Sequence, residues 1–253
     1  MKTAQFMKCT GAALAALAIA TTAFAESVST ISFSSPLCGG LQPVTYTANG
    51  AISMQLAEGS GICQVGLTAR AGNGSVGILA AMDVSPGAIG SEPSVSTATL
   101  SAKSETEINL DFSESELMNF PVGLIPVSLQ AHLDGFTSVS AQGISGFFEG
   151  GESALLAQIM LSGFNVAGSS VSSSNVVSIS SAASSSTSSG PRTDADLFPD
   201  SLLAPTIFID PTRPVTVEFS LSGGVTQRGH NDAFIVSTLD ALNTLSFALD
   251  GPA

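Results

Sequence analysis

The sequence has no tryptophan, a single tyrosine and few basic residues. Its 253 residues include Tyr46 as the only tyrosine, and seven Lys and Arg stand against 20 Asp and Glu, so the net charge is −13. Proteins that bind nucleic acid need many Lys and Arg to neutralise phosphates, which excludes nucleic acid as a partner. The same shortage disfavours attachment to an anionic membrane surface. Sugar sites commonly present flat aromatic faces, so the lack of Trp argues against a glycosidase or a lectin.

The first 25 residues predict a secretory signal peptide. Lys2 and Lys8 are followed by the apolar run 11–22, and residues 23–25 (AFA) have the small-x-small pattern of a cleavage site. Removal of residues 1–25 leaves five basic residues against 20 acidic ones, a net charge of −15. No later apolar run is long enough to cross a bilayer. We therefore expect a mature protein without a membrane span, secreted or located in the periplasm or at the cell surface.

Cysteine usage agrees with export. Cys9 leaves with the signal peptide, so Cys38 and Cys63 are the pair that remains. Two cysteines in a protein of an oxidising compartment predict one disulfide bond. It would stabilise the fold by roughly 3 kcal/mol in the chain-entropy model. A metal-binding thiol pair is the less favoured alternative, because no His or third Cys lies nearby.

Short alternating segments separated by turn residues run along the whole mature chain. They predict a mainly β fold, an antiparallel β-sandwich of jelly-roll or Ig-like type. The dipeptides Asn49-Gly50 and Asn73-Gly74 each predict a two-residue hairpin. Residues 231–242 have near-helical spacing, but their β-branched residues favour a strand, whereas residues 113–116 fit a helix capping box. The other expected strands are 28–33, 44–48, 52–56, 62–69, 76–81, 95–100, 107–112, 127–133, 137–144, 154–164, 176–179, 206–209, 215–221 and 245–249.

A serine-rich segment interrupts this pattern. Thirteen of the 21 residues of 169–189 are Ser, and the acidic segment 194–200 follows. Such a composition buries little apolar area, so we expect a disordered loop or linker over residues 169–200. The remainder, 202–253, is short for an independent β domain, which favours a single domain over residues 26–253.

Residues 72–77 (GNGSVG) match the Gly-x-Gly-x-x-Gly pattern of dinucleotide-binding loops. That interpretation requires a helix directly afterwards, and Pro86-Gly87 would break a long one. The hairpin at Asn73-Gly74 explains the same residues, and we favour it.

Three aspartates in the acidic segment are candidate calcium ligands. Asp194, Asp196 and Asp200 offer carboxylate oxygens, the donors that calcium prefers. Their spacing departs from an EF-hand loop, which needs a Gly at the sixth position and a Glu at the twelfth. A solvated acidic segment is the favoured interpretation, so no cofactor is predicted and calcium is the alternative.

Both histidines have an aspartate two residues further on. The pairs are His132 with Asp134 and His230 with Asp232, and in a strand each pair would share one face. A metal site or a His–Asp dyad is the chemical alternative to two surface histidines beside turns. No Gly-x-Ser-x-Gly elbow is present, so no catalytic residue is predicted.

The C-terminal residues 210–219 (DPTRPVTVEF) and 240–247 (DALNTLSF) resemble exported β-rich proteins of the PEP-CTERM-associated type from Gram-negative bacteria. The resemblance covers about the last 50 residues. Members of that group end in Pro-Glu-Pro, an apolar span and a basic tail, and are linked with the exopolysaccharide matrix. This chain has none of these three features, so anchoring in the envelope is not implied. The resemblance implies an exported β-rich protein without known activity.

These observations lead to one main functional hypothesis. We expect an exported, non-enzymatic β-sandwich protein of the cell envelope or extracellular matrix that acts by adhesion or assembly. Its partners would be itself, other envelope or matrix proteins, or polysaccharide. The alternatives are a secreted carbohydrate-active or ester hydrolase and a calcium-dependent binding module.

Overall fold

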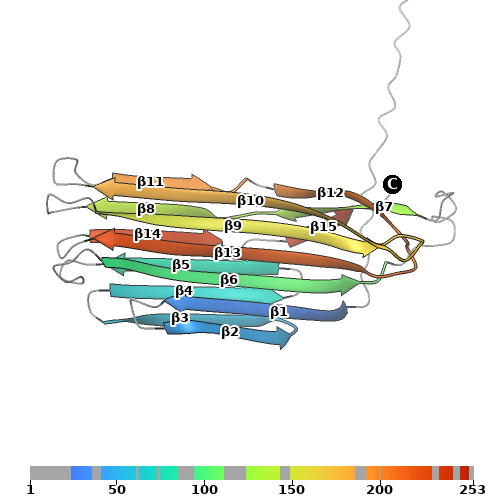
Figure 1. The fold of residues 1–253 in the computed structure, drawn as a ribbon, viewed down its shortest axis with the longest axis horizontal. Coiled ribbons are helices and arrows are strands. Elements are labelled where there is room, and N and C mark those ends of the chain that lie inside the picture. Colours follow the sequence, from blue (N-terminus) through green and yellow to red (C-terminus); the bar gives the residue numbers. More distant parts are fainter. Residues whose placement is uncertain are drawn as a thin grey trace, which may run out of the picture.

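The chain folds as two layers of long antiparallel strands. The computed structural model describes residues 24–35, 41–60, 63–72, 75–84, 94–110, 124–142, 149–185, 192–199, 201–229, 234–241 and 246–250. Every regular element in these ranges is a strand, and the strands run along the long axis of the molecule (Figure 1). None of the described residues forms a helix that could span a bilayer. The predicted antiparallel β-sandwich is confirmed.

One layer is a six-stranded sheet that we call the front sheet. Its spatial order is β10-β9-β13-β6-β1-β2, with antiparallel pairing throughout. The central strands β9, β13 and β6 are 15 or 16 residues long, so this sheet extends along most of the length of the molecule. The strands are β1 (Phe24–Ser35), β2 (Leu41–Asn49), β6 (Ser94–Ile108), β9 (Glu149–Phe164), β10 (Ser170–Ser185) and β13 (Val215–Gly229).

The second layer consists of a six-stranded back sheet and a three-stranded short sheet. The back sheet has the order β11-β8-β14-β5-β4-β3, and the short sheet has the order β12-β7-β15. The back-sheet strands are β3 (Ile52–Ser60), β4 (Cys63–Gly72), β5 (Ser75–Val84), β8 (Phe136–Gln142), β11 (Arg192–Leu197) and β14 (Phe234–Ala241). The short-sheet strands are β7 (Ile125–His132), β12 (Ser201–Ile209) and β15 (Ser246–Asp250).

The short sheet continues three strands of the back sheet. In the sequence β7 is followed directly by β8, β11 by β12 and β14 by β15, and the two strand orders match. Figure 1 shows the short sheet at one end of the layer, beyond β11, β8 and β14. Together the two sheets cover the inner face of the longer front sheet.

The core lies between the two layers and consists mainly of aliphatic side chains. Strand alternation sends every second residue inward, so β9 contributes Leu155, Ile159 and Leu161, all at most 1% exposed. Fully burying such a side chain stabilises the fold by about 1.5–3 kcal/mol. Residues on both sides of the serine-rich segment belong to the same core cluster, for example Leu161 before it and Phe219 after it.

The structure corrects the prediction of a disordered loop or linker over residues 169–200. Residues 170–185 form β10, which pairs residue by residue with β9, and residues 192–197, which include the first part of the acidic segment, form β11. Backbone hydrogen bonds to β9 hold β10 in place, so its side chains need not be large. Ile179, Ser181 and Ala183 are buried, while most of the serines occupy the exposed positions. Serine content therefore marked an exposed strand face, not a loop.

The two Asn-Gly signals have different outcomes. β4 and β5 pair with Gly72 opposite Ser75, so the hairpin at Asn73-Gly74 is confirmed and the dinucleotide interpretation is dropped. The prediction at Asn49-Gly50 is wrong. A tight turn does occur there, with Gly50 at φ +88°, but β2 pairs with β1 in the front sheet and β3 pairs with β4 in the back sheet. This turn carries the chain from one layer to the other.

Two further expectations can be compared with the structure, and two others cannot. Residues 234–241 form a strand, as favoured over a helix. Residues 95–100 and 107–112, expected as two strands, are mostly joined in β6. The signal peptide, apart from its last two residues, and the capping box at 113–116 lie outside the described residues and stay predictions.

Candidate binding face

The outer face of the front sheet is built from small and hydroxyl-bearing side chains. Alternation along β10, β9, β13, β6 and β1 turns Ser, Thr, Ala and Gly outward at most positions near the middle of the sheet. The pairing register lines these residues up across the strands. One such row contains Ser178, Leu156, Ser222, Ser101, Ser32 and Thr45. The next row contains Ser180, Ala154, Gly224, Thr99 and Ser34.

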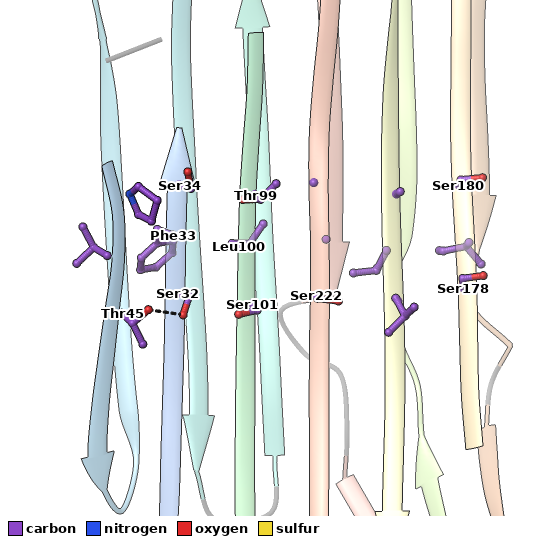
Figure 2. A pocket seen from close by; sticks show the side chains of 18 residues that line it. Ser32, Phe33, Ser34, Thr45, Thr99, Leu100, Ser101, Ser178, Ser180 and Ser222 are labelled. Carbon is purple, nitrogen blue, oxygen red and sulfur yellow. Dashed lines mark hydrogen bonds between the residues drawn. The ribbon is translucent and has the colours of Figure 1, made fainter. Parts of the chain in front are cut away.

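These two rows form the floor of a shallow trough that crosses all six strands. Its volume is about 830 Å³, and it extends from Pro43 and Thr45 on β2 to Ser178 and Ser180 on β10. Figure 2 shows the labelled hydroxyl groups spread over neighbouring strands. Among the described residues that line the trough, none is charged. Neighbouring strands lie about 4.8 Å apart, so six strands give it a length of roughly 24 Å.

One cross-strand hydrogen bond joins two hydroxyl groups of the trough, and a second lies beside the trough on the same pair of strands. The Oγ of Ser32 lies 2.9 Å from Oγ1 of Thr45, and Thr30 and Thr47 make a similar contact of 3.3 Å between their Oγ1 atoms. A hydroxyl group has one donor and two acceptor positions, so each one keeps further capacity for a ligand. The trough therefore presents hydroxyl donors and acceptors without net charge.

A charged cluster lies beside the trough on the same face. The Nζ of Lys103 is 2.9 Å from Oε2 of Glu218 and 3.5 Å from Oε2 of Glu105. Burial lowers the pKa of Lys103, but the hydrogen bond and charge of Glu218, together with Glu105, outweigh it and hold the pKa above its usual 10.5. This cation is therefore already neutralised by its neighbours.

A second hollow adjoins the other side of the trough. It has a volume of about 490 Å³, and its lining includes Gly150 and Gly151 together with the exposed side chains of Glu152 and Arg228. One carboxylate and one guanidinium leave this hollow without net charge, so it adds no preference for a charged ligand.

The predicted calcium ligands have a structural role at the edge of the sandwich. The Oδ2 of Asp194 accepts a hydrogen bond of 2.9 Å from the backbone N–H of Ala182 on β10. The Oδ1 of Asp196 accepts one from the N–H of Leu197. Asp200 lies outside the described residues. Within the described ranges no group of three or more His, Cys, Asp or Glu could hold a metal ion, and calcium binding stays a prediction.

The structure describes one of the two histidine–aspartate pairs, His132 with Asp134. His132 is the last residue of β7, and both His132 and Asp134 are exposed at the short link to β8. His230 and Asp232 lie outside the described residues, as does Cys38, the predicted disulfide partner of Cys63 in β4. The His–Asp sites and the disulfide therefore stay predictions.

The sequence analysis missed the trough, which is assembled from common residues. Ser32, Ser101 and Ser222 come from strands that are far apart in the sequence, and none belongs to a recognisable motif. The only available signal was the alternation of Ser and Thr with apolar residues, which also describes any exposed strand face.

Comparisons with known proteins add little. No protein-family model matches the sequence, and no curated protein matches it. One similar solved structure concerns carbohydrate-binding modules of the β-sandwich superfamily, with 11% identity over 88% of this chain and 86% of that chain and a TM-score of 0.14. Another is a particle derived from infectious bursal virus, with 12% identity over 90% of this chain and 62% of that chain and a TM-score of 0.13. At such TM-scores neither structure carries an argument about this chain.

Proposed function

We propose that this chain is an exported, non-enzymatic β-sandwich protein of the cell envelope or extracellular matrix that adheres to polysaccharide through the outer face of its front sheet. The observation that carries this proposal is the uncharged trough of about 830 Å³ across six strands. An extended polymer of sugars fits its length and its open ends. Export rests on the predicted signal peptide and on the predicted disulfide.

Phe33, the one aromatic residue among the described residues that line the trough, is buried, so the trough would bind a hydroxyl-rich ligand through its own hydroxyl groups and not through an aromatic face. Each hydrogen bond between the trough and a sugar replaces bonds to water, so its net contribution is only about 0.5–1.5 kcal/mol. Several rows of hydroxyl groups must therefore bind the ligand at the same time. The strand pairing fixes the positions of these rows before the ligand binds, which lowers the entropic cost of binding. Leu156, Pro43 and Val44 add apolar contacts at the two sides of the trough.

The test compares two substitutions on the same strand. Ser222→Phe places a large side chain in the trough, whereas Thr216→Phe makes the same change on the same outer face of β13 but outside the trough. We expect the mature protein and Thr216→Phe to bind a matrix polysaccharide in co-sedimentation and calorimetry, and Ser222→Phe to bind at least about tenfold more weakly.

Two results would contradict the proposal. Equal binding by both variants would show that the trough is not the site. Turnover of a glycoside or ester panel, abolished by His132→Ala, would instead favour the hydrolase.

A further inference from the structure

The free edges of the two large sheets meet along one side of the sandwich. β2 is the last strand of the front sheet and β3 is the last strand of the back sheet, and the turn at Asn49-Gly50 joins them. Figure 1 shows both strands along the same margin of the molecule. We call this margin the β2/β3 rim. A free strand edge presents unpaired backbone N–H and C=O groups that another strand can pair with.

The β2/β3 rim has almost no charge in a strongly acidic protein. Residues 27–57 contain no Asp, Glu, Lys, Arg or His, and Glu58 follows near the end of β3, although the whole chain carries a net charge of −13. Natural proteins usually protect free edges with charged side chains, proline or covering loops. β2 has Pro43, but the described side chains of β3, residues 52–57, include neither a charge nor a proline.

The opposite side of the sandwich is protected. Asp194 accepts a hydrogen bond from the edge N–H of Ala182, and Asn175 accepts one of 2.8 Å from Val176 N–H. Two further bonds connect β10 to β12 in the other layer, from Asn175 Nδ2 to the carbonyl of Leu203 at 2.8 Å and from Ser173 Oγ to that of Pro205 at 2.6 Å. Among the described strands of the two large sheets, the contrast makes the β2/β3 rim more accessible than the β10/β11 side.

The geometry of β3 is suitable for a new pair. Its link to β4 leaves two residues between Ser60 and Cys63, and the residues that flank such a hairpin loop bond to each other. Counting back from this pair, the backbone groups of Ser53, Gln55 and Ala57 face away from β4. The alternate side chains Ile52, Met54 and Leu56 are half-buried against the core, so an added strand would cover them further.

We propose that two copies of this chain pair through β3, antiparallel to each other, about a two-fold axis normal to the sheets. An antiparallel edge is self-complementary under such an axis, so one surface serves both copies. Two acidic molecules repel wherever their carboxylates approach, and the rim is the place where they can meet with the least of that cost. The pairing makes one continuous sheet from two back sheets and does not use the outer face of the front sheet, where the trough lies.

The single tyrosine gives a local reporter of this contact. Tyr46 is the only tyrosine, the chain has no Trp, and Tyr46 lies on β2 and is 41% exposed. Tyrosine emission therefore comes from the rim alone. We expect acrylamide quenching of the mature protein to fall as the protein concentration rises, in step with the mass measured by sedimentation velocity.

The decisive variants place a charge on one edge or the other. Gln55→Lys puts two like charges close to each other across the proposed pair, and Ser172→Lys makes the same kind of change on exposed β10. We expect Gln55→Lys to weaken dimerisation at least about tenfold and Ser172→Lys to leave it unchanged, both with wild-type circular dichroism. Gln55→Pro, which removes an outward N–H, should act like Gln55→Lys.

Three results would overturn the proposal. These are a wild-type protein that stays monomeric at about 1 mM, a dimer that survives Gln55→Lys, and a dimer that Ser172→Lys disrupts. A protein that binds only foreign strands would show the first result. Polysaccharide binding by a monomeric Gln55→Lys variant would leave the proposed function intact, so the two proposals fail separately.

Discussion

Gly72 lies where the β4–β5 hairpin passes the turn between the two layers. Its φ is +135°, and a Cβ atom added there would lie 2.4 Å from the Cα of Ala51. Both the backbone conformation and the close approach therefore require glycine. Gly66, on the same strand, has an ordinary φ, and a Cβ atom added there would meet no other atom within 4 Å.

We expect Gly72→Ala to lower the free energy of unfolding by about 2–5 kcal/mol, because it adds backbone strain to a backbone clash. Gly66→Ala is the matched control and should be neutral or slightly stabilising. Urea denaturation followed by circular dichroism measures both. Similar stability for the two variants would show that the turn relaxes freely.

Gln227 links the two layers through the core. Its side chain is fully buried, and Nε2 donates to the carbonyl of Met82 at 2.8 Å and to that of Ile235 at 3.1 Å. These carbonyls belong to β5 and β14, which are neighbours in the back sheet. The amide of a front-sheet residue thus satisfies two backbone groups of the opposite layer.

We expect Gln227→Leu to cost about 1–3 kcal/mol, because two buried carbonyls lose their donor while the side-chain volume stays similar. Gln158→Leu makes the same change on the outer face of β9 and should alter stability by less than about 0.5 kcal/mol. Thermal unfolding of both variants is the measurement. An equal effect would mean that the carbonyls find other donors.

The position of Gln227 follows from alternation, but its partners do not. The inward positions of β13 alternate along the strand: Val215, Val217, Phe219, Leu221 and Val225 are buried, Gly223 lies between the last two and is half-buried, and residue 227 continues the series. A strand predicted only to residue 221 could not place it inward. The carbonyls that it contacts belong to distant strands, so no local pattern could identify them.

At the scale of elements, β10 and β11 are held together at their free edges by side chains. Asp194 of β11 accepts a hydrogen bond from Ala182 N–H of β10, whereas Asp196, two residues further on, accepts one from its neighbour Leu197 in the same strand. A hydrogen bond to a charged group contributes about 1.5–3 kcal/mol.

We therefore expect Asp194→Ala to increase the exchange rate of the Ala182 amide hydrogen by roughly tenfold or more. Asp196→Ala should leave that rate unchanged. Residue-resolved hydrogen exchange by NMR distinguishes the two. Equal protection of Ala182 in both variants would show that Asp194 contributes nothing to the edge.

The turn between β12 and β13 carries a titrating group. Asp210 Oδ1 accepts hydrogen bonds from Thr212 Oγ1 at 2.7 Å and Thr212 N–H at 2.9 Å, and Arg213 Nε lies 3.8 Å from Oδ2. The hydrogen bonds of Thr212, followed by the charge of Arg213, hold the pKa of Asp210 below its usual 3.8. The guanidinium of Arg213 also lies 5.2 Å from the Phe164 ring centre, so this turn packs against the β9–β10 turn.

A lowered pKa means that Asp210 stabilises the folded state while it is charged. Its contribution is present above the unfolded pKa and is lost as the pH falls through the lower, folded value. We expect Thr212→Val to move the pKa of Asp210 upward, towards 3.8, because it removes the side-chain hydrogen bond. NMR titration of the Asp210 carboxyl carbon tests this, and no change would contradict the assigned cause.

Elements were easier to predict than their connections. Most strands follow from period-two alternation, because one face of each packs on the core. The pairs Asn49-Gly50 and Asn73-Gly74 give the same local signal, yet one links two layers and the other closes a hairpin. The difference arises from pairing with β1 and β4, which no short window contains. For the same reason the trough, assembled from six strands, could not be predicted.

At the scale of the whole molecule, charge and contact surface are separated. The net charge of −15 expected for the mature chain comes from residues outside 27–57, so the β2/β3 rim is nearly neutral within an acidic molecule. Repulsion between two copies acts over about 10 Å at 0.1 M salt and is screened at higher concentration.

We expect dimerisation through the rim to strengthen when sodium chloride is raised from about 0.02 M to about 0.5 M, because salt screens the long-range repulsion and the proposed contact has no ion pair to lose. Sedimentation velocity at both concentrations measures the change. A dimer that weakens with salt would indicate an ionic contact elsewhere.

The order of the front sheet also sets how the chain reaches its folded state. β6 and β13 lie side by side along their whole length, although their paired residues are more than a hundred positions apart in the sequence. The chain must lose the entropy of closing this long loop before the contacts between β6 and β13 can stabilise it. Chains dominated by such distant pairs therefore fold slowly. The front sheet cannot be completed until β13 has been synthesised. Such a delay in folding would suit the proposed export, because a chain crosses a membrane more readily before it folds.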